Sequence, residues 1–212
     1  MILMKRIGIG KSIVASVTVV TPAIPERIGN WLPQTIHSVN SQTVLPETHI
    51  VGFDYERIGC AAMMARLLPA VNTEWFVPLA DDDVLHPGFL ERLLGASEGA
   101  DVVYPWCNVS GRNWNPNSHF DAGRLMGENY IPSTALIRTS TFRELGGYDP
   151  VVCEDWSYWV KVVKAGKVIR CLPEVLWDYR FHHDEYGRPE NISEGWQYEW
   201  HNWHGYTWSH NG

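Results

Sequence analysis

The most concentrated chemistry in the sequence is a run of three carboxylates, Asp81-Asp82-Asp83, directly after an apolar segment. Like charges this close repel one another, and a divalent cation that prefers oxygen ligands would offset the repulsion. Mg²⁺ and Mn²⁺ are commonly held by one or two carboxylates together with substrate phosphates. Carboxylates also favour helix starts, so an acidic loop before the helix expected near Pro87 is the alternative. The triplet alone leaves both interpretations open.

A second acidic pair, Glu154-Asp155, opens a segment with helical spacing and is followed by Trp156. One of these carboxylates could remove a proton from a hydroxyl group as a general base. Complementation of the helix dipole is the alternative, and the pair alone favours it. Further along, His182 and His183 follow an expected strand, and one imidazole could complete a metal site with the acidic triplet. A structural or surface role is the ordinary one for such histidines.

Tryptophan is unusually frequent, with 11 in 212 residues, about four times ordinary usage. Aromatic rings can stack on the faces of sugars, although Trp75 and Trp177 fall in apolar segments and are expected in the core. Four more lie between Trp196 and Trp208, in a polar aromatic tail over 186–212 that shows no helix or strand period. We expect this tail to help hold an acceptor or to cover the site; the alternative is that it packs on the domain's own surface.

Alternating strand-like and helix-like segments must position these groups. Strands are expected over 14–20, 48–53, 74–80, 101–105 and 131–138, and residues 168–181 are expected to form one bent strand or two short ones. Helices are expected over 31–41, 59–68, 87–95 and 154–165, and a further short helix is expected to end at Gly146-Gly147. Asn30 is the expected N-cap of the first helix, and residues 108–129 are expected to be a loop. This order is typical of an α/β fold with a mostly parallel sheet. Ligands of such sheets bind beyond the carboxyl ends of the strands, where Thr21-Pro22, Asp54 and the acidic triplet lie.

Composition narrows the class of protein. The chain has 17 basic and 24 acidic residues and a formal net charge of −7, which argues against a nucleic-acid or anionic-membrane partner. The apolar stretch 13–24 is too short to span a bilayer, so no transmembrane segment is expected, and its Val and Thr content favours a buried strand over a signal peptide. The four cysteines lack C-x-x-C spacing, so we expect reduced thiols in a cytoplasmic protein.

Together, these motifs resemble those of the inverting family 2 glycosyltransferases of the GT-A fold. The similar motifs are Thr21-Pro22 (the nucleotide-facing turn), Ser41-Gln42-Thr43 (the end of S-x-x-x-Q-T), Asp54, Asp81-Asp82-Asp83 (D-x-D), Gly146-Gly147-Tyr148-Asp149 (G-G-[FY]-D), Glu154-Asp155-Trp156 (E-D-[WY]) and Arg180-Phe181-His182 (R-x-H). The resemblance covers residues 14–185 in order. It implies one GT-A domain over 1–185, with a nucleotide-binding half over 14–100 and an acceptor half over 101–185.

The resemblance implies transfer of a sugar from a nucleotide-diphosphate donor to a carbohydrate or other acceptor hydroxyl, with inversion and with Mn²⁺ or Mg²⁺ as cofactor. It implies Asp155 as catalytic base, and it leaves Glu154 either to orient that base or to complement the helix dipole. The implied metal ligands are Asp83, Asp81 (or ribose contact) and His182, with His183 as the fallback. The implied donor contacts are Thr21, Pro22, Asp54, Arg66, Asp81 and Asp82, and the implied acceptor contacts are Trp156 and Trp106.

Three positions depart from the family pattern. Typical members carry a further carboxylate where Ala80 stands, although Asp81 and Asp83 keep the D-x-D spacing. Ala23 stands where tyrosine is common, and Arg66 is displaced from the usual Arg-Asn pair of the second helix. The alternatives are a catalytically inactive sugar- or nucleotide-binding module of the same fold, and a nucleotidyltransferase. The glycine-rich phosphate loop of a nucleotidyltransferase is missing, because residues 21–27 contain no glycine. The sugar, the acceptor and the oligomeric state stay open.

Overall fold

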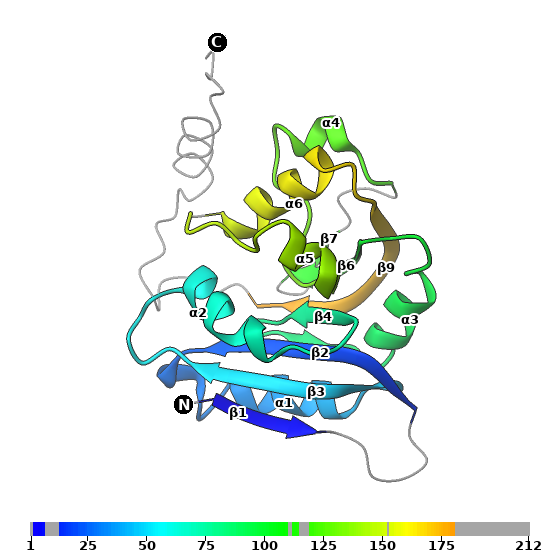
Figure 1. Ribbon diagram of the computed structural model, residues 1–212. Helices are drawn as coiled ribbons and strands as arrows, with labels where there is room; N and C mark the ends of the chain where they lie inside the picture. The colour runs from blue at the N-terminus through cyan, green and yellow to red at the C-terminus, as the bar shows by residue number, and fades with distance from the viewer. Residues whose placement is uncertain (1, 7–12, 110–111, 115–118, 152, 181–212) are drawn as a thin grey trace.

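The computed structural model describes residues 2–6, 13–109, 112–114, 119–151 and 153–180 (Figure 1). The strands are β1 (Ile2–Arg6), β2 (Val14–Ala23), β3 (Leu45–Phe53), β4 (Trp75–Pro78), β5 (Val84–Leu85), β6 (Val102–Val109), β7 (Arg112–Trp114), β8 (Leu136–Arg138) and β9 (Ile169–Tyr179). The helices are α1 (Leu32–Asn40), α2 (Cys60–Leu67), α3 (Phe89–Gly95), α4 (Ala122–Leu125), α5 (Thr139–Glu144) and α6 (Glu154–Lys164), with short 3₁₀ turns η1 (Pro25–Arg27) and η2 (Leu68–Ala70).

Within the described ranges, nine strands form one sheet in the order β1-β3-β2-β4-β8-β6-β9-β5, with β7 added to β6. The expected α/β class is confirmed, but the sheet is mixed. Strand pairing is parallel between β3, β2 and β4 and between β6 and β9, and antiparallel elsewhere. Parallel pairs arise where helices cross over between strands, as α1 does between β2 and β3. β8 runs antiparallel to both of its neighbours, β4 and β6.

Helices cover both faces of the sheet, so its central strands are buried on both sides. Val20 packs with α2, α5 and α6, whereas its neighbour Val19 packs with α1 and α3 on the opposite face. Tyr158 and Trp159 of α6 share a core with Val20, so the two halves expected along the chain are joined by one hydrophobic core. The division into nucleotide and acceptor halves stays a functional prediction.

Several local expectations are corrected by tertiary pairing. Trp31, not Asn30, precedes α1, and no side chain caps that helix. The segment expected to be a loop contains the end of β6, all of β7 and α4, because β6 is extended by its pairing with β9 and β7. The strand expected over 131–138 is shortened to β8, and residues 169–179 form one continuous strand. Trp75 and Trp177 lie in the core, as predicted.

In the part of the chain that the structure describes, no helix is both long enough and apolar enough to cross a membrane. The aromatic tail over 186–212 lies outside the described residues, and so do His182 and His183. The roles expected for the tail, and the cytoplasmic location expected from the cysteine pattern, stay predictions.

Candidate active site

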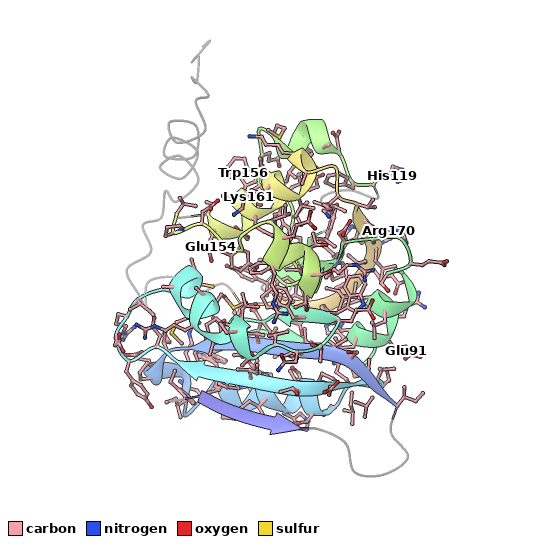
Figure 2. All side chains as sticks on the ribbon, viewed as in Figure 1. Glu91, His119, Glu154, Trp156, Lys161 and Arg170 are labelled. Atoms are coloured by element: carbon pink, nitrogen blue, oxygen red, sulfur yellow. The ribbon has the colours of Figure 1, made fainter. Side chains whose placement is uncertain are left out.

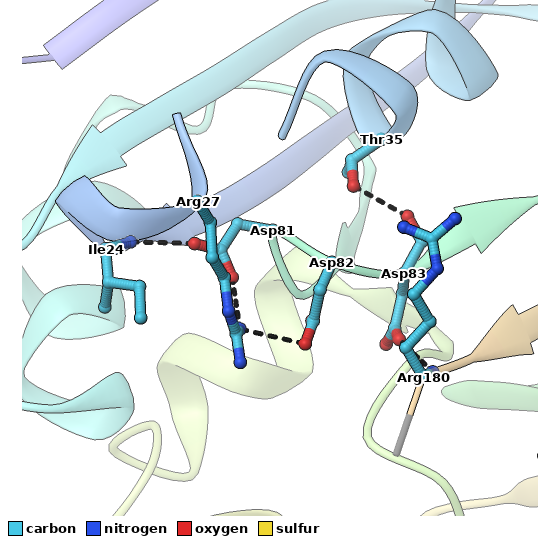
Figure 3. Close-up of polar contacts among 7 residues, drawn as sticks. All are labelled: Ile24, Arg27, Thr35, Asp81, Asp82, Asp83 and Arg180. Atoms are coloured by element: carbon cyan, nitrogen blue, oxygen red, sulfur yellow. Dashed lines mark hydrogen bonds and ion pairs between the residues drawn. The ribbon is translucent and has the colours of Figure 1, made fainter. Parts of the chain in front are cut away.

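The acidic triplet lies in the short loop between β4 and β5, and the carboxylates of its first two members point at the same cation (Figure 3). Asp81 accepts hydrogen bonds from the Ile24 amide at 2.7 Å and from Arg27 Nη1 at 2.6 Å. The same guanidinium nitrogen lies 3.0 Å from Asp82 Oδ2. The turn η1, which follows β2, therefore places the positive charge of Arg27 against the loop that follows β4.

Asp83 points elsewhere and ties the loop to the end of β9 and to α1 (Figure 3). Its carboxylate accepts the Arg180 amide hydrogen at 3.0 Å, and its main-chain oxygen accepts the Thr35 hydroxyl at 2.7 Å. The Arg180 guanidinium lies over the Trp31 ring, with 4.3 Å to its centroid, and donates to Gln34 at 2.6 Å. Arg180 thus joins α1, β9 and the acidic loop.

Burial makes the negative charges of this loop costly. Burial raises the pKa of Asp81, and the hydrogen bonds from Arg27 and Ile24 oppose that rise. Burial raises the pKa of Asp83 well above its usual range, and the neighbouring charge of Asp82 adds to the rise. Because burial disfavours the ionised carboxylates, positive charge beside them is favourable, and Arg27 supplies it to Asp81 and Asp82 in this structure.

The loop offers the hard oxygen ligands that Mg²⁺ and Mn²⁺ prefer. Among the described residues, no three Asp, Glu, His or Cys side chains gather closely enough to hold a metal by themselves. An ion that takes one or two carboxylates, and fills its shell with diphosphate oxygens and water, does not need such a cluster. Asp81 and Asp82 already converge on one cationic nitrogen, so the donor set fits a divalent cation. The predicted imidazole ligands lie outside the described residues.

The predicted donor contacts at the end of β2 are partly enclosed. Thr21 is fully buried, and its Oγ lies 3.0 Å from Nε2 of His49 on β3. Pro22, the next residue, is half-buried. The Thr21 hydroxyl therefore links two neighbouring strands, and Pro22 is the more accessible of the two predicted contacts.

Of the other two predicted donor contacts, Asp54 precedes α2 and Arg66 lies in its last turn. Asp54 accepts hydrogen bonds from the amides of Ile58 at 3.0 Å and Gly59 at 2.9 Å, so its carboxylate shapes the loop that leads into the helix. Arg66, near the end of the helix, is exposed and pairs with Glu56 at 2.9 Å. This ion pair raises the pKa of Arg66 and lowers that of Glu56. Asp54 thus has a structural role beside any contact with a base.

The second acidic pair lies in the first turn of α6 (Figure 2). The Asp155 carboxylate accepts the Trp156 amide hydrogen at 2.7 Å and faces the Asn129 side-chain amide at 3.4 Å. Burial, with the charge of Glu154 adding to it, raises the pKa of Asp155 to about 7. A carboxylate with a pKa near neutrality is well matched to general-base catalysis.

The glycine turn before α6 holds that helix in place. Gly146 and Gly147 have positive φ of 77° and 74°, a conformation that other residues rarely adopt. Lys161 Nζ donates to the Gly147 carbonyl at 2.6 Å and to Asp149 at 3.0 Å, and Ser157 also bonds to Asp149. The turn is therefore bonded to the same helix that carries Asp155.

The two tryptophans predicted to contact the acceptor differ in placement. Trp156 is 2% exposed, and its indole N–H donates to the Leu125 carbonyl at 2.7 Å, which ties α6 to α4. Its ring is therefore on the inner face of the helix, and the acceptor contact predicted for Trp156 stays a prediction. Trp106 on β6 is half-buried and stays a candidate.

Sequence reasoning missed two residues of the site. Arg27 belongs to no motif, and only the fold brings it to the acidic loop, which is 54 residues away along the chain. Asn129 approaches Asp155 from a segment that reads as an irregular loop. No spacing signal in the sequence could have found either residue, since both contacts are long-range.

The overall fold is that of the GT-A glycosyltransferases. It is similar to Staphylococcus aureus TarS 1–349 in complex with UDP-GlcNAc, with a TM-score of 0.65 and 12% identity over 80% of this chain and 60% of that chain. It is also similar to the mannosyltransferase PcManGT from Pyrobaculum calidifontis in complex with GDP-Man and Mn²⁺, with a TM-score of 0.63 and 15% identity over 81% and 58% of the two chains. The chain thus spans about three fifths of the length of these structures. No protein-family model and no curated protein matches its sequence.

Proposed function

We propose that the chain is an inverting glycosyltransferase of family 2, which transfers a sugar from a nucleoside-diphosphate donor to an acceptor hydroxyl. The observation that carries the proposal is Asp155, a carboxylate with a pKa of about 7 in the first turn of α6, within a GT-A fold that also presents the acidic loop after β4. The complexes of the similar structures with UDP-GlcNAc and GDP-Man support the class of donor.

Asp155 would accept the proton of the acceptor hydroxyl as that oxygen attacks the anomeric carbon from the side opposite the diphosphate. A single displacement of this kind inverts the anomeric configuration. Glu154 would orient the base, and its charge already helps to raise the pKa of Asp155. Trp106 would contact the acceptor. The arrangement separates the two tasks, because the base lies on α6 and the donor contacts lie around β2, α2 and the acidic loop.

The donor diphosphate would be held at the acidic loop. Asp83 and Asp81 would ligate Mn²⁺ or Mg²⁺, which when bound supplies positive charge to the departing diphosphate. His182 or His183 is the proposed further ligand. The proposed contacts to the nucleotide are Thr21, Pro22, Asp54, Arg66 and Asp82. The complex of PcManGT with Mn²⁺ supports the choice of cation.

The test is acceptor-dependent turnover by the purified full chain. UDP- and GDP-sugars are incubated with Mn²⁺ and a panel of hydroxyl acceptors, and both the nucleoside diphosphate released and the glycosylated product are measured. Turnover that requires an acceptor and yields the inverted anomer supports the proposal. Retention of the anomeric configuration in the product would overturn the inverting mechanism.

One observation favours the alternative of a catalytically inactive nucleotide-binding module. The Arg66 guanidinium, a proposed donor contact, is paired with Glu56 at the protein surface. Binding of a nucleoside diphosphate without turnover of any donor, by protein that is fully folded, would support this alternative.

A further inference from the structure

Arg27 is the one cation that contacts two members of the acidic triplet among the described residues. Its Nη1 lies 2.6 Å from Asp81 and 3.0 Å from Asp82. The Arg27 side chain is 13% exposed, and those of Asp81 and Asp82 are 4% and 7% exposed. A charge pair removed from water to this degree differs from an ordinary surface ion pair, which contributes little to stability.

The turn that carries Arg27 is fastened to the same loop at a second point. The Ile24 amide donates to the other oxygen of the Asp81 carboxylate at 2.7 Å. Pro25 opens the 3₁₀ turn between these two contacts, and its ring restricts the backbone there. Both oxygens of Asp81 are therefore engaged by the segment 24–27 (Figure 3).

The Arg27 guanidinium and a divalent cation held by Asp83 and Asp81 would share the Asp81 carboxylate. Two positive charges so close in a partly desolvated site repel each other strongly, so each weakens the binding of the other to the loop. A diphosphate would change that balance, because guanidinium groups bind phosphate oxygens through paired hydrogen bonds. Arg27 could then leave the carboxylates for the diphosphate as the cation enters.

We propose that Arg27 is the counter-ion of the acidic loop in the donor-free protein, and that it moves from Asp81 and Asp82 to the donor diphosphate when the divalent cation binds. The inference rests on the proposed function, since it takes a metal-bound diphosphate as the ligand. Arg27 is thus a positioning residue that couples the two binding events. Without a nucleotide it weakens cation binding, and with one it strengthens diphosphate binding.

The test measures both events by calorimetry in the wild type and in Arg27→Gln. Mn²⁺ alone is titrated first, and then UDP or GDP at saturating Mn²⁺. Arg27→Gln should bind Mn²⁺ about tenfold or more tightly than the wild type, since a repelling charge is gone. The same variant should bind the nucleoside diphosphate about tenfold less tightly, since a charged partner is gone. If Arg27 had only a structural role, the substitution would weaken the binding of both Mn²⁺ and the nucleoside diphosphate.

Two further variants complete the experiment. Arg92→Gln removes an exposed guanidinium paired with Glu174, and both affinities should equal those of the wild type. Arg27→Lys keeps the charge but lacks the paired hydrogen bonds of a guanidinium, so its Mn²⁺ affinity should stay close to that of the wild type while its affinity for UDP or GDP falls. Circular dichroism and thermal melting check that each variant is folded. If Arg27→Gln does not fold, the comparison of Arg27→Lys with the wild type decides.

The outcomes separate the two proposals. Mn²⁺ affinity that is equal to or weaker than the wild-type value in folded Arg27→Gln, or no Mn²⁺ binding by that variant, overturns the role of Arg27. If only Arg27→Lys folds, an affinity for UDP or GDP equal to that of the wild type overturns the role of Arg27 as well. Failure of every variant, the wild type included, to bind UDP or GDP would instead count against the proposed function.

Discussion

At the scale of single residues, Asp155 is the group on which turnover should depend most. Replacing it with Asn keeps the size of the side chain and removes its basicity, so sugar transfer should fall by about 10²–10⁴-fold. Donor affinity should change little, because the base contacts the acceptor. Steady-state rates and nucleotide calorimetry measure the two effects. Glu154→Gln is the matched control and should be milder, and near wild-type turnover by Asp155→Asn with a verified acceptor would show that another group is the base.

The pH dependence of transfer should report the same group. Asp155 must be ionised to accept a proton, and its pKa is raised to about 7. The value of kcat/KM should therefore rise with pH through about 7 and level off above it. Any residual activity of Asp155→Asn should lack this limb. A profile of initial rates from pH 5 to 9 at subsaturating acceptor measures it, and an unchanged limb in the variant would assign the ionisation elsewhere.

The raised pKa of Asp155 also predicts how stability depends on pH. The folded state favours the protonated carboxyl, so the contribution is complete below the usual pKa of 3.8 and is lost as pH rises through about 7. Asp155→Asn has no proton to lose at this position. As pH rises from 3.8 to about 7, the free energy of unfolding of the wild type should therefore fall relative to that of the variant. Urea unfolding of both proteins at pH 5 and pH 8 measures the change. A difference that stays constant across this window would contradict the prediction.

At the scale of elements, Asp54 fastens the start of α2. Its two carboxylate oxygens accept the amide hydrogens of Ile58 and Gly59, which would otherwise lack these acceptors. Asp54→Ala should lower the free energy of unfolding by about 1–3 kcal/mol, the usual cost of leaving a buried polar group unsatisfied. Denaturant unfolding measures it, with Asp54→Asn as a milder control because the amide oxygen still accepts. Unchanged stability of Asp54→Ala would show that the two hydrogen bonds do not hold this loop.

The elements also show how far a sequence can be interpreted. The helices over 59–68 and 154–165 and the strand ends that carry Thr21, Asp54 and the acidic loop follow from local periodicity, and the structure has elements at these places. Residues 102–109 could not be recognised as one long strand, because the pairing with β9 that extends it is made by a segment over sixty residues away. The contact of Arg27 with Asp81 was hidden for the same reason.

At the scale of the whole molecule, a ligand in the acidic loop should stabilise the entire fold. The loop is bonded to η1 after β2, to α1 and to the end of β9, so its binding geometry exists only when these distant segments are assembled. UDP or GDP with Mn²⁺, at about 100 times the dissociation constant, should add about 2.7 kcal/mol to the free energy of unfolding. Thermal melting with and without a chelator measures this effect. An equal increase in melting temperature with and without the chelator would show that the ligand binds without the cation.

β9 determines when the last part of the sheet can form during synthesis of the chain. The parallel strands β2, β3 and β4 lie within the first 78 residues and can pair early. β6 can pair with β7 and β8, but its other side, and β5, lack a partner until residues 169–179 are made. The Asp83 carboxylate lacks one hydrogen-bond donor until the next residue, Arg180, supplies its amide. Until then β6 exposes an unpaired edge that invites pairing with other chains. A nascent chain stalled before residue 169 would therefore expose this edge to pairing with other chains.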